Sequence, residues 1–245
     1  DVLIRTLYEA GPWNGNKVYS YDLDDPTGED KRTKRLSYYL RTKKGNCVSM
    51  PILVAILAQR LGFITTLSTT PGHMIVKFVN DDGQWFNVEA TSGEYVYDST
   101  YERDTKITPL AIKNGIYLRP LSPREAVGAM ASTLMEDLYA KKRADPLMGV
   151  ARAVLAVNAK DVIAMLYVGN AYGIMVQQRY KDKYPSLTEM PVAMRPEYNR
   201  LALANLEWFE KAEKLGWQPQ SKKDIDNYLA SIAREKAKRT KEGKL

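Results

Sequence analysis

The sequence contains very little cysteine and histidine: one of each, Cys47 and His73, in 245 residues. One cysteine excludes a disulfide scaffold within the chain and any metal site that needs several cysteines. One histidine excludes a multi-histidine metal site. No apolar run approaches the roughly 20 residues that a helix needs to span a bilayer. A protein that used a thiol and an imidazole for chemistry would therefore have to use Cys47 and His73.

The chain is neither strongly acidic nor uniformly basic, which limits the partners that its charge can attract. The net charge is +7, and residues 221–245 hold +4 of it. A nucleic-acid binder usually places aromatic or polar readers among its basic residues, but this stretch has no aromatic residue after Tyr228. We therefore interpret it as a solvated helix end with a frayed tail, and expect no nucleic-acid partner.

A change of composition near residue 120 predicts two domains. Residues 1–120 are rich in Gly, Thr, Asn and aromatic residues and show strand patterns, whereas 121–245 are rich in Ala, Leu, Met, Lys and Glu. We expect an α+β domain followed by an all-α domain. The periodicity predicts helices at 122–142, 145–157, 161–181, 196–215 and 221–240.

The first domain is predicted to contain a buried helix and a β-hairpin. After a short helix at 34–42, the apolar spacing of residues 47–61 predicts a helix that ends at Gly62. Pro51 fits only in the first turn, so this helix must begin close to Cys47. Residues 63–70 read as a strand, and 72–79 and 84–91 as the two strands of a hairpin.

Cys47 and His73 each occupy a position suited to catalysis. A thiol at a helix N-terminus meets unpaired backbone N–H groups and the positive end of the helix dipole, which favour the thiolate and could hold an oxyanion. Either residue taken alone is more often structural than catalytic. The hairpin adds a test: a three-residue loop, 81–83, places Ile75 opposite Glu89, with His73 diagonally beyond on the same face. A two-residue loop, Asp82-Gly83, would place Glu89 on the other face.

A thiol, an imidazole and a carboxylate together are what nucleophilic acyl transfer requires. The runs that contain them are GNCVSMPILVAILAQRLG, GHMIVKF and WFNVEATSG. They resemble the bacterial transglutaminase-like superfamily of papain-like cysteine enzymes over about residues 40–120. The resemblance implies Cys47 as nucleophile, His73 as general base and acid, and Glu89 as the group that orients His73. Glu89 stands where the wider superfamily most often has Asp, so Asn87 on the same face is the reserve candidate.

The resemblance implies a papain/transglutaminase-like core, a helix packed on an antiparallel sheet, that acts on peptide or protein amides. Peptide hydrolysis, deamidation and transfer to an amine stay open, because water or an amine can accept the acyl group. No metal or organic cofactor is implied. No second oxyanion donor can be assigned, and Trp85 is expected in the core rather than as a wall of the site.

The helical half has a weaker resemblance of its own. The run ARAVLAVNAKDVIAMLYVGNAY resembles one tetratricopeptide-type repeat, which suggests a helical domain that binds a protein partner or shapes access to the cleft. The alternative function is a catalytically inactive interaction protein that works through these helices. Because the chain starts at Asp1 rather than Met, we expect an exported or periplasmic bacterial protein in preference to a cytoplasmic one.

Overall fold

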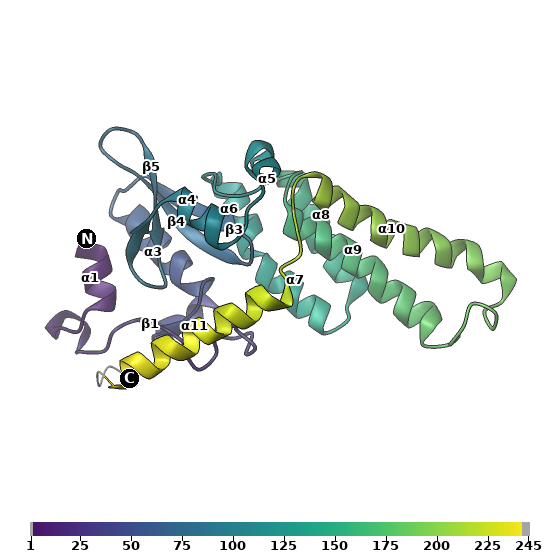
Figure 1. The fold of residues 1–245 in the computed structure, drawn as a ribbon, viewed down its shortest axis with the longest axis horizontal. Helices are drawn as coiled ribbons and strands as arrows, with labels where there is room; N and C mark the ends of the chain where they lie inside the picture. Colours follow the sequence, from purple (N-terminus) through teal and green to yellow (C-terminus); the bar gives the residue numbers. More distant parts are fainter. Residues whose placement is uncertain (1, 242–245) are drawn as a thin grey trace. The chain divides into compact units, whose positions relative to one another are not determined.

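The computed structural model describes residues 2–241, which pack as two compact units (Figure 1). Of the described residues, one unit contains 2–107 together with 218–241, and the other contains 108–217. Packing therefore groups residues 108–120 with the helical unit and the last helix with the first unit, which differs from the predicted division at 120. Folding as two independent domains stays a prediction, and the predicted frayed tail after residue 241 lies outside the described residues.

The first unit is α+β, as predicted. Its four-stranded antiparallel sheet has the order β3-β4-β5-β6, and helix α3 packs against β3 and β4 (Figure 1). A short parallel pair, β1 and β2, precedes α3. The elements of this unit are α1 (Val2–Tyr8), η1 (Pro12–Asn14), β1 (Ser20–Tyr21), α2 (Leu36–Thr42), β2 (Lys44–Gly45), α3 (Ser49–Arg60), β3 (Thr65–Thr70), β4 (His73–Val79), β5 (Trp85–Glu89), β6 (Glu94–Val96), α4 (Asp98–Asp104) and α11 (Lys222–Lys241).

The β4–β5 hairpin has the three-residue loop. Val76 pairs with Val88 and Val79 with Trp85, a register that places Ile75 opposite Glu89. The N–H of Gly83 donates to the carbonyl of Asn80 at 3.0 Å, and Gly83 has a φ of 76°. A left-handed residue closing a type I turn is what this loop length favours. Glycine adopts that conformation without the steric cost that a side chain would bring.

Helix α3 begins where Pro51 requires. It starts at Ser49, so Pro51 is its third residue and its missing N–H removes no intrahelical hydrogen bond. The helix ends before Gly62, which has a φ of 87°. Six of its first seven residues are apolar, and all seven are buried. The helix is therefore held by packing on both sides rather than by one amphipathic stripe.

The second unit is helical and has an apolar core. Its elements are α5 (Pro109–Asn114), α6 (Pro123–Met130), α7 (Ser132–Ala140), α8 (Ala144–Val157), α9 (Val162–Val176), η2 (Gln177–Lys181, a π-helical turn), η3 (Val192–Met194) and α10 (Arg195–Lys214). The helix predicted at 122–142 is divided at Ala131 into α6 and α7.

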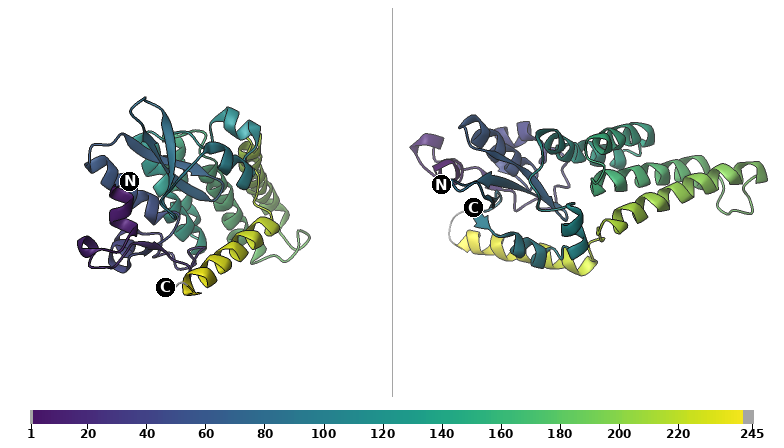
Figure 2. Two further views of the ribbon diagram at one scale, coloured as in Figure 1. Left: turned by 60° about the vertical axis from the view of Figure 1, so that its left-hand side comes forward. Right: turned by 90° about the horizontal axis from the view of Figure 1, so that it is seen from above.

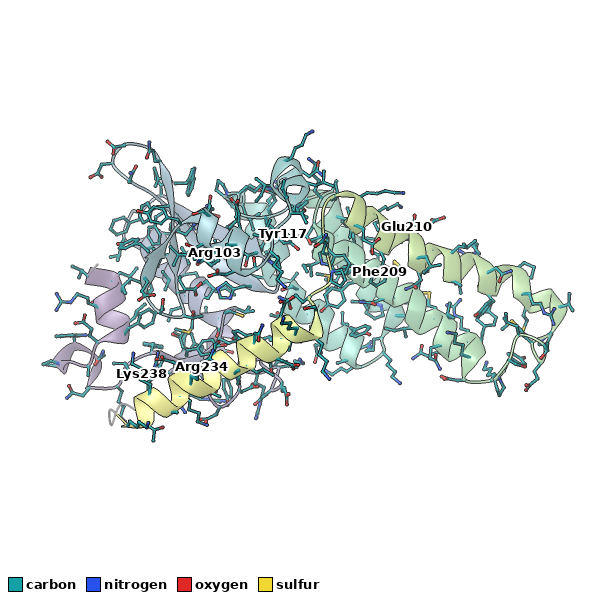
Figure 3. All side chains as sticks on the ribbon, in the orientation of Figure 1. Arg103, Tyr117, Phe209, Glu210, Arg234 and Lys238 are labelled. Atoms are coloured by element: carbon teal, nitrogen blue, oxygen red, sulfur yellow. The ribbon has the colours of Figure 1, made fainter. Side chains whose placement is uncertain are left out.

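Helix α9 packs between α8 and α10 because a glycine lets α10 approach. A methyl group at Gly169 would lie 2.9 Å from the ring of Phe209, which is marked in Figure 3. Asn205 also donates to the carbonyl of Gly169 at 2.7 Å. The close approach buries both faces of α9. The tetratricopeptide resemblance of this region stays a prediction.

Figure 2 shows the same ribbon from two further sides, with the helices of the second unit in teal and green. Among residues 2–241, no helix combines the length and the apolar character that crossing a membrane requires.

Candidate functional site

Cys47 lies in a turn that a buried asparagine holds in place. The side-chain oxygen of Asn46 accepts the N–H groups of Val48 at 3.0 Å and Ser49 at 3.3 Å, and its Nδ2 donates to Thr33 Oγ1 at 3.1 Å. Asn46 thus satisfies two N–H groups that a helix start otherwise leaves unpaired. The following side chain, Cys47, is half-buried. The thiol therefore stands at a fixed position directly before α3.

The backbone N–H of Cys47 is available at this turn. No described residue accepts a hydrogen bond from it, whereas the next two N–H groups are taken up by Asn46. An N–H at the N-terminus of α3 can donate to an oxyanion that forms on a carbonyl attacked by the thiol. The arrangement supplies one such donor, and the described contacts assign no second one.

His73 and Glu89 meet across the hairpin. Nε2 of His73 lies 2.6 Å from Oε2 of Glu89, and their side chains are 22% and 14% exposed. His73 begins β4 and Glu89 ends β5, so the three-residue loop brings them to one face at the same end of the two strands. Nε2 is used by the carboxylate, so Nδ1 is the ring nitrogen left for a partner. Cys47 is the other side chain that raises the pKa of His73.

The charges around His73 favour its protonated form. Burial acts to lower the pKa of His73, but hydrogen bonds to Cys47 and Glu89 and the negative charges of those two groups outweigh burial and raise it to about 10. A protonated imidazole that a carboxylate holds in place can exchange a proton with a neighbouring thiol.

Three further donors, from two residues, hold Glu89. Oε1 accepts Thr91 Oγ1 at 2.6 Å and Thr91 N–H at 3.0 Å, and Oε2 accepts the hydroxyl of Tyr101 at 2.9 Å. Burial acts to raise the pKa of Glu89, but His73 and then Thr91 donate to the carboxylate and lower it to about 2. The carboxylate is therefore charged and fixed in orientation.

Asn87, the reserve candidate, belongs to a different cluster. Its Nδ2 donates to the carbonyl of Val96 at 2.9 Å and to Asp98 Oδ1 at 2.7 Å, and Asp98 also accepts the buried Lys77 at 2.9 Å. Asn87 shares the sheet face of Glu89 but pairs with Lys77, two residues beyond Ile75 along β4. Glu89, not Asn87, is thus the side chain that meets His73.

The expectation for Trp85 is wrong. Trp85 is 41% exposed rather than part of the core. It pairs with Val79 at the loop end of the hairpin, where the strands extend past the packed part of the sheet. Strand alternation could not reveal this, because it shows which face a side chain lies on and not how deeply that part of the strand is packed.

Three residues without a predicted role support the site. Asn46 and Thr91 could have been found from the sequence, since Asn is a favoured helix cap and Thr91 follows Glu89 in the WFNVEATSG run. No sequence pattern pointed to Tyr101, because it lies on α4, a helix that periodicity did not predict. Its contact with Glu89 arises from the path of the chain after β6.

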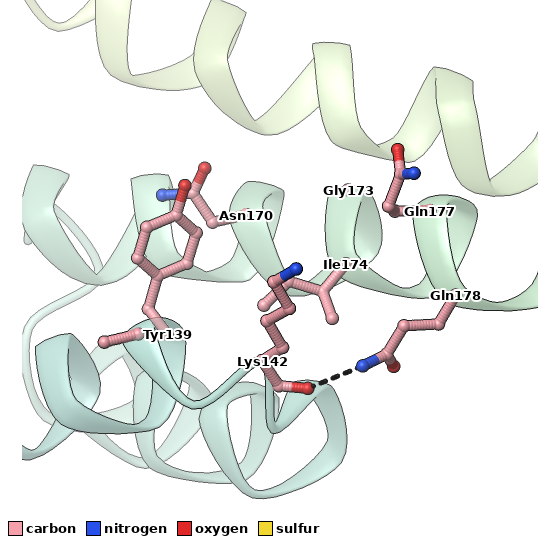
Figure 4. A pocket seen from close by; sticks show the side chains of 8 residues that line it. Tyr139, Lys142, Asn170, Gly173, Ile174, Gln177 and Gln178 are labelled. Carbon is pink, nitrogen blue, oxygen red and sulfur yellow. Dashed lines mark hydrogen bonds between the residues drawn. The ribbon is translucent and has the colours of Figure 1, made fainter. Parts of the chain in front are cut away.

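A separate cavity of about 350 Å³ lies in the second unit (Figure 4). Its lining comes from α7, α9 and the π-helical turn, and Gln178 donates to the carbonyl of Lys142 at 3.0 Å beside it. The cavity contains no cysteine, histidine or carboxylate. In residues 2–241 no group of three or more His, Cys, Asp or Glu side chains is arranged to hold a metal ion.

Comparison with known families supports the resemblance of the three motifs. Residues 11–132 match the family model described as the transglutaminase-like superfamily, a range that includes Cys47, His73 and Glu89. No curated protein and no solved structure matches the chain.

Proposed function

We propose that residues 11–132, which match the transglutaminase-like superfamily, act as a cysteine-dependent acyl-transfer enzyme on amides of peptides or protein side chains. Cys47 is the nucleophile, His73 the proton carrier and Glu89 the group that orients His73. The 2.6 Å contact between Nε2 of His73 and Glu89 is the observation that carries the proposal, and the effect of Cys47 on the pKa of His73 supports it. The roles follow from the chemistry that such a triad supports.

In the first half-reaction, Sγ of the Cys47 thiolate attacks the amide carbonyl carbon. The carbonyl oxygen gains negative charge, and the Cys47 N–H is positioned to donate to it. His73 gives its Nδ1 proton to the departing nitrogen, the C–N bond breaks and a thioester remains. Glu89 keeps the imidazole in place while its charge changes.

In the second half-reaction, His73 takes a proton from water or from an amine, and that acceptor attacks the thioester carbonyl. The C–S bond breaks and the Cys47 thiolate returns with a protonated His73. Water yields hydrolysis or deamidation, whereas an amine yields a new amide. Both outcomes use the same three side chains, so the acceptor depends on access to the thioester.

The reactivity of Cys47 tests the thiol–imidazole pair. Wild type should react quickly with iodoacetamide at pH 6, and His73→Ala should react at least about tenfold more slowly, because the imidazolium no longer favours the thiolate. Glu89→Gln should fall between them. Glu94→Gln is the matched control, since Glu94 lies opposite Glu89 in the β5–β6 pairing and its carboxylate accepts a hydrogen bond from Ser92. Slow alkylation that His73→Ala does not change would overturn the proposal.

Turnover is tested with a glutamine-containing peptide. Ammonia release without added amine indicates deamidation, incorporation of a fluorescent primary amine indicates transfer, and new termini indicate hydrolysis. Cys47→Ala should abolish each of them. If alkylation is fast yet none of these products forms over a panel of peptides, the alternative of an inactive interaction protein is favoured, with the second unit as its binding surface.

A further inference from the structure

Helix α11 lies across the segments that hold the two reactive side chains. The helix packs with the first unit, although residues 108–217 of the second unit lie between them in the sequence. Figure 1 shows α11, in yellow, running alongside the segment that contains β1. Its contacts fall at three places, near His73, near Cys47 and between them.

The N-terminal end of α11 is attached beside His73. Gln220 Nε2, two residues before the helix, donates to the carbonyl of Pro71 at 3.4 Å. Pro71 and Gly72 form the turn that leads directly into His73. Asp224 in the first turn of the helix also pairs with Lys106 at 2.5 Å. This end is thus tied to the turn before β4 and to the end of α4.

The C-terminal half of α11 is attached beside Cys47. Lys236 pairs with Asp24 at 2.6 Å, and Asp24 pairs in turn with Lys44 at 3.1 Å. Lys44 is on β2, three residues before Cys47. The two ends of α11 are therefore linked to the chain segments that precede His73 and Cys47.

A tyrosine in the middle of α11 reaches toward the thiol. The hydroxyl of Tyr228 lies 2.5 Å from that of Tyr21, and Tyr21 pairs with Gly45 in the β1–β2 ladder, two residues before Cys47. Burial raises the pKa of Tyr228, the bond to Tyr21 opposes this, and the negative charges of Cys47 and Glu89 raise it further. The hydroxyl pair therefore lies within electrostatic reach of both groups.

Helix α11 is attached to the rest of the first unit by weak contacts. None of its residues is buried, and the ion pairs of Lys106 and Lys236 are mostly exposed. Exposed ion pairs stabilise little and are screened by salt. An element with few buried contacts opens at low free-energy cost compared with the core. The helix is thus attached by groups that can separate while the sheet and α3 stay folded.

We propose that α11 is a reversible strap over the site, which restricts bulky acyl donors and acceptors while Tyr228 is bonded to Tyr21 and admits them when the helix lifts. This strap rests on the proposed function, because α11 would control access to the site proposed there. Cys47 is half-buried, so a helix held over the segment that precedes it would limit access by size. Opening requires the loss of these polar contacts and of few buried ones, since no residue of α11 is buried.

The test compares two thiol reagents on the full chain: iodoacetamide, which is small, and a maleimide carrying a long polyethylene glycol chain. Tyr228→Ala and Lys236→Glu should each raise the ratio of the bulky to the small rate by about fivefold, because the closed state becomes less populated. Lys238→Glu makes the same charge change on an exposed lysine of the same helix (Figure 3) and should leave the ratio unchanged. Added salt should raise the wild-type ratio.

The outcomes separate the strap from the proposed function. A ratio that neither Tyr228→Ala nor Lys236→Glu changes would overturn the strap, even if small-reagent alkylation still depends on His73. Loss of that His73 dependence would count against the proposed function instead. Lys236→Glu alters an exposed side chain, so it tests the strap even if Tyr228→Ala fails to fold. Hydrogen exchange faster in α11 than in α3 of wild type is expected, and equal protection would also contradict the strap.

Discussion

The two units bury different kinds of side chain. The sheet of the first unit buries a lysine, Lys77, and partly buries a charged pair, His73 and Glu89, and each is matched by hydrogen bonds or an ion pair. The second unit packs α8, α9 and α10 around apolar side chains such as Leu147 and Val168. A buried polar group is costly once it loses a partner, whereas an apolar core is sensitive to lost volume. Substitutions should therefore disturb chemistry in the first unit and stability in the second.

The largest effect on stability is expected in the second unit. Leu147 is fully buried in α8, so Leu147→Ala should lower the free energy of unfolding by about 2–5 kcal/mol through the cavity it leaves. Val157→Ala, at the exposed end of the same helix, is the control and should change it by less than about 0.5 kcal/mol. Urea denaturation followed by circular dichroism measures both. If folded Leu147→Ala alters the alkylation rate of Cys47, the second unit affects the chemistry of the first, contrary to this expectation.

The next effect is the pH dependence of stability in the first unit. His73 has a raised pKa, so its contribution is complete below its usual value of 6.5 and is lost as pH rises through about 10. Glu89 has a lowered pKa, so its contribution is complete above its usual value of 4.5 and is lost as pH falls through about 2. The difference in unfolding free energy between wild type and His73→Ala should therefore be greatest between pH 4.5 and 6.5. A difference that is flat with pH would show that the pair is not ionised.

A smaller effect is expected when Glu89 loses one donor. Tyr101→Phe removes the hydroxyl that lies 2.9 Å from Oε2 and should lower the rate of amide turnover by about tenfold. The low-pH limb of the rate profile should move to higher pH, because a carboxylate with fewer donors is protonated more easily. Tyr97→Phe, on an exposed tyrosine at the start of α4, is the matched control. An unchanged pH profile in Tyr101→Phe would assign Tyr101 a purely structural role.

The smallest effect tests the turn that sets the register. Gly83 has a φ of 76° with open space around it, so Gly83→Ala should destabilise by about 1 kcal/mol through backbone strain alone. Gly149→Ala is the control: Gly149 lies inside α8 with open space and no positive φ, and alanine should stabilise it by up to about 1 kcal/mol. Thermal unfolding of both variants checks the sign. Destabilisation by Gly149→Ala would show that helix packing, not propensity, dominates there.

Much of the hairpin and of α3 could be predicted because their determinants are local. The Asn80–Gly83 turn decides which strand residues face one another, and that choice puts Glu89 on the face of His73. Pro51 and Gly62 limit α3 from both ends. The sequence did not predict α4 or β6, because both are short and their positions depend on what they pack against. The division of 122–142 at Ala131 likewise has no proline or glycine to mark it.

The sequence by itself determined that one thiol and one imidazole exist, that the thiol lies close to a helix start and the imidazole at a strand start, and that one turn geometry would bring a carboxylate to the imidazole. Only the tertiary structure decided that Thr91 and Tyr101 donate to that carboxylate, that Asn87 and Lys77 both donate to Asp98 instead, and that α11 packs with the first unit. The reason is distance along the chain. Turn chemistry and helix starts act over a few residues, whereas Tyr228 meets Tyr21 across 207 positions. No local preference encodes such a contact, because it forms only when the intervening chain has folded.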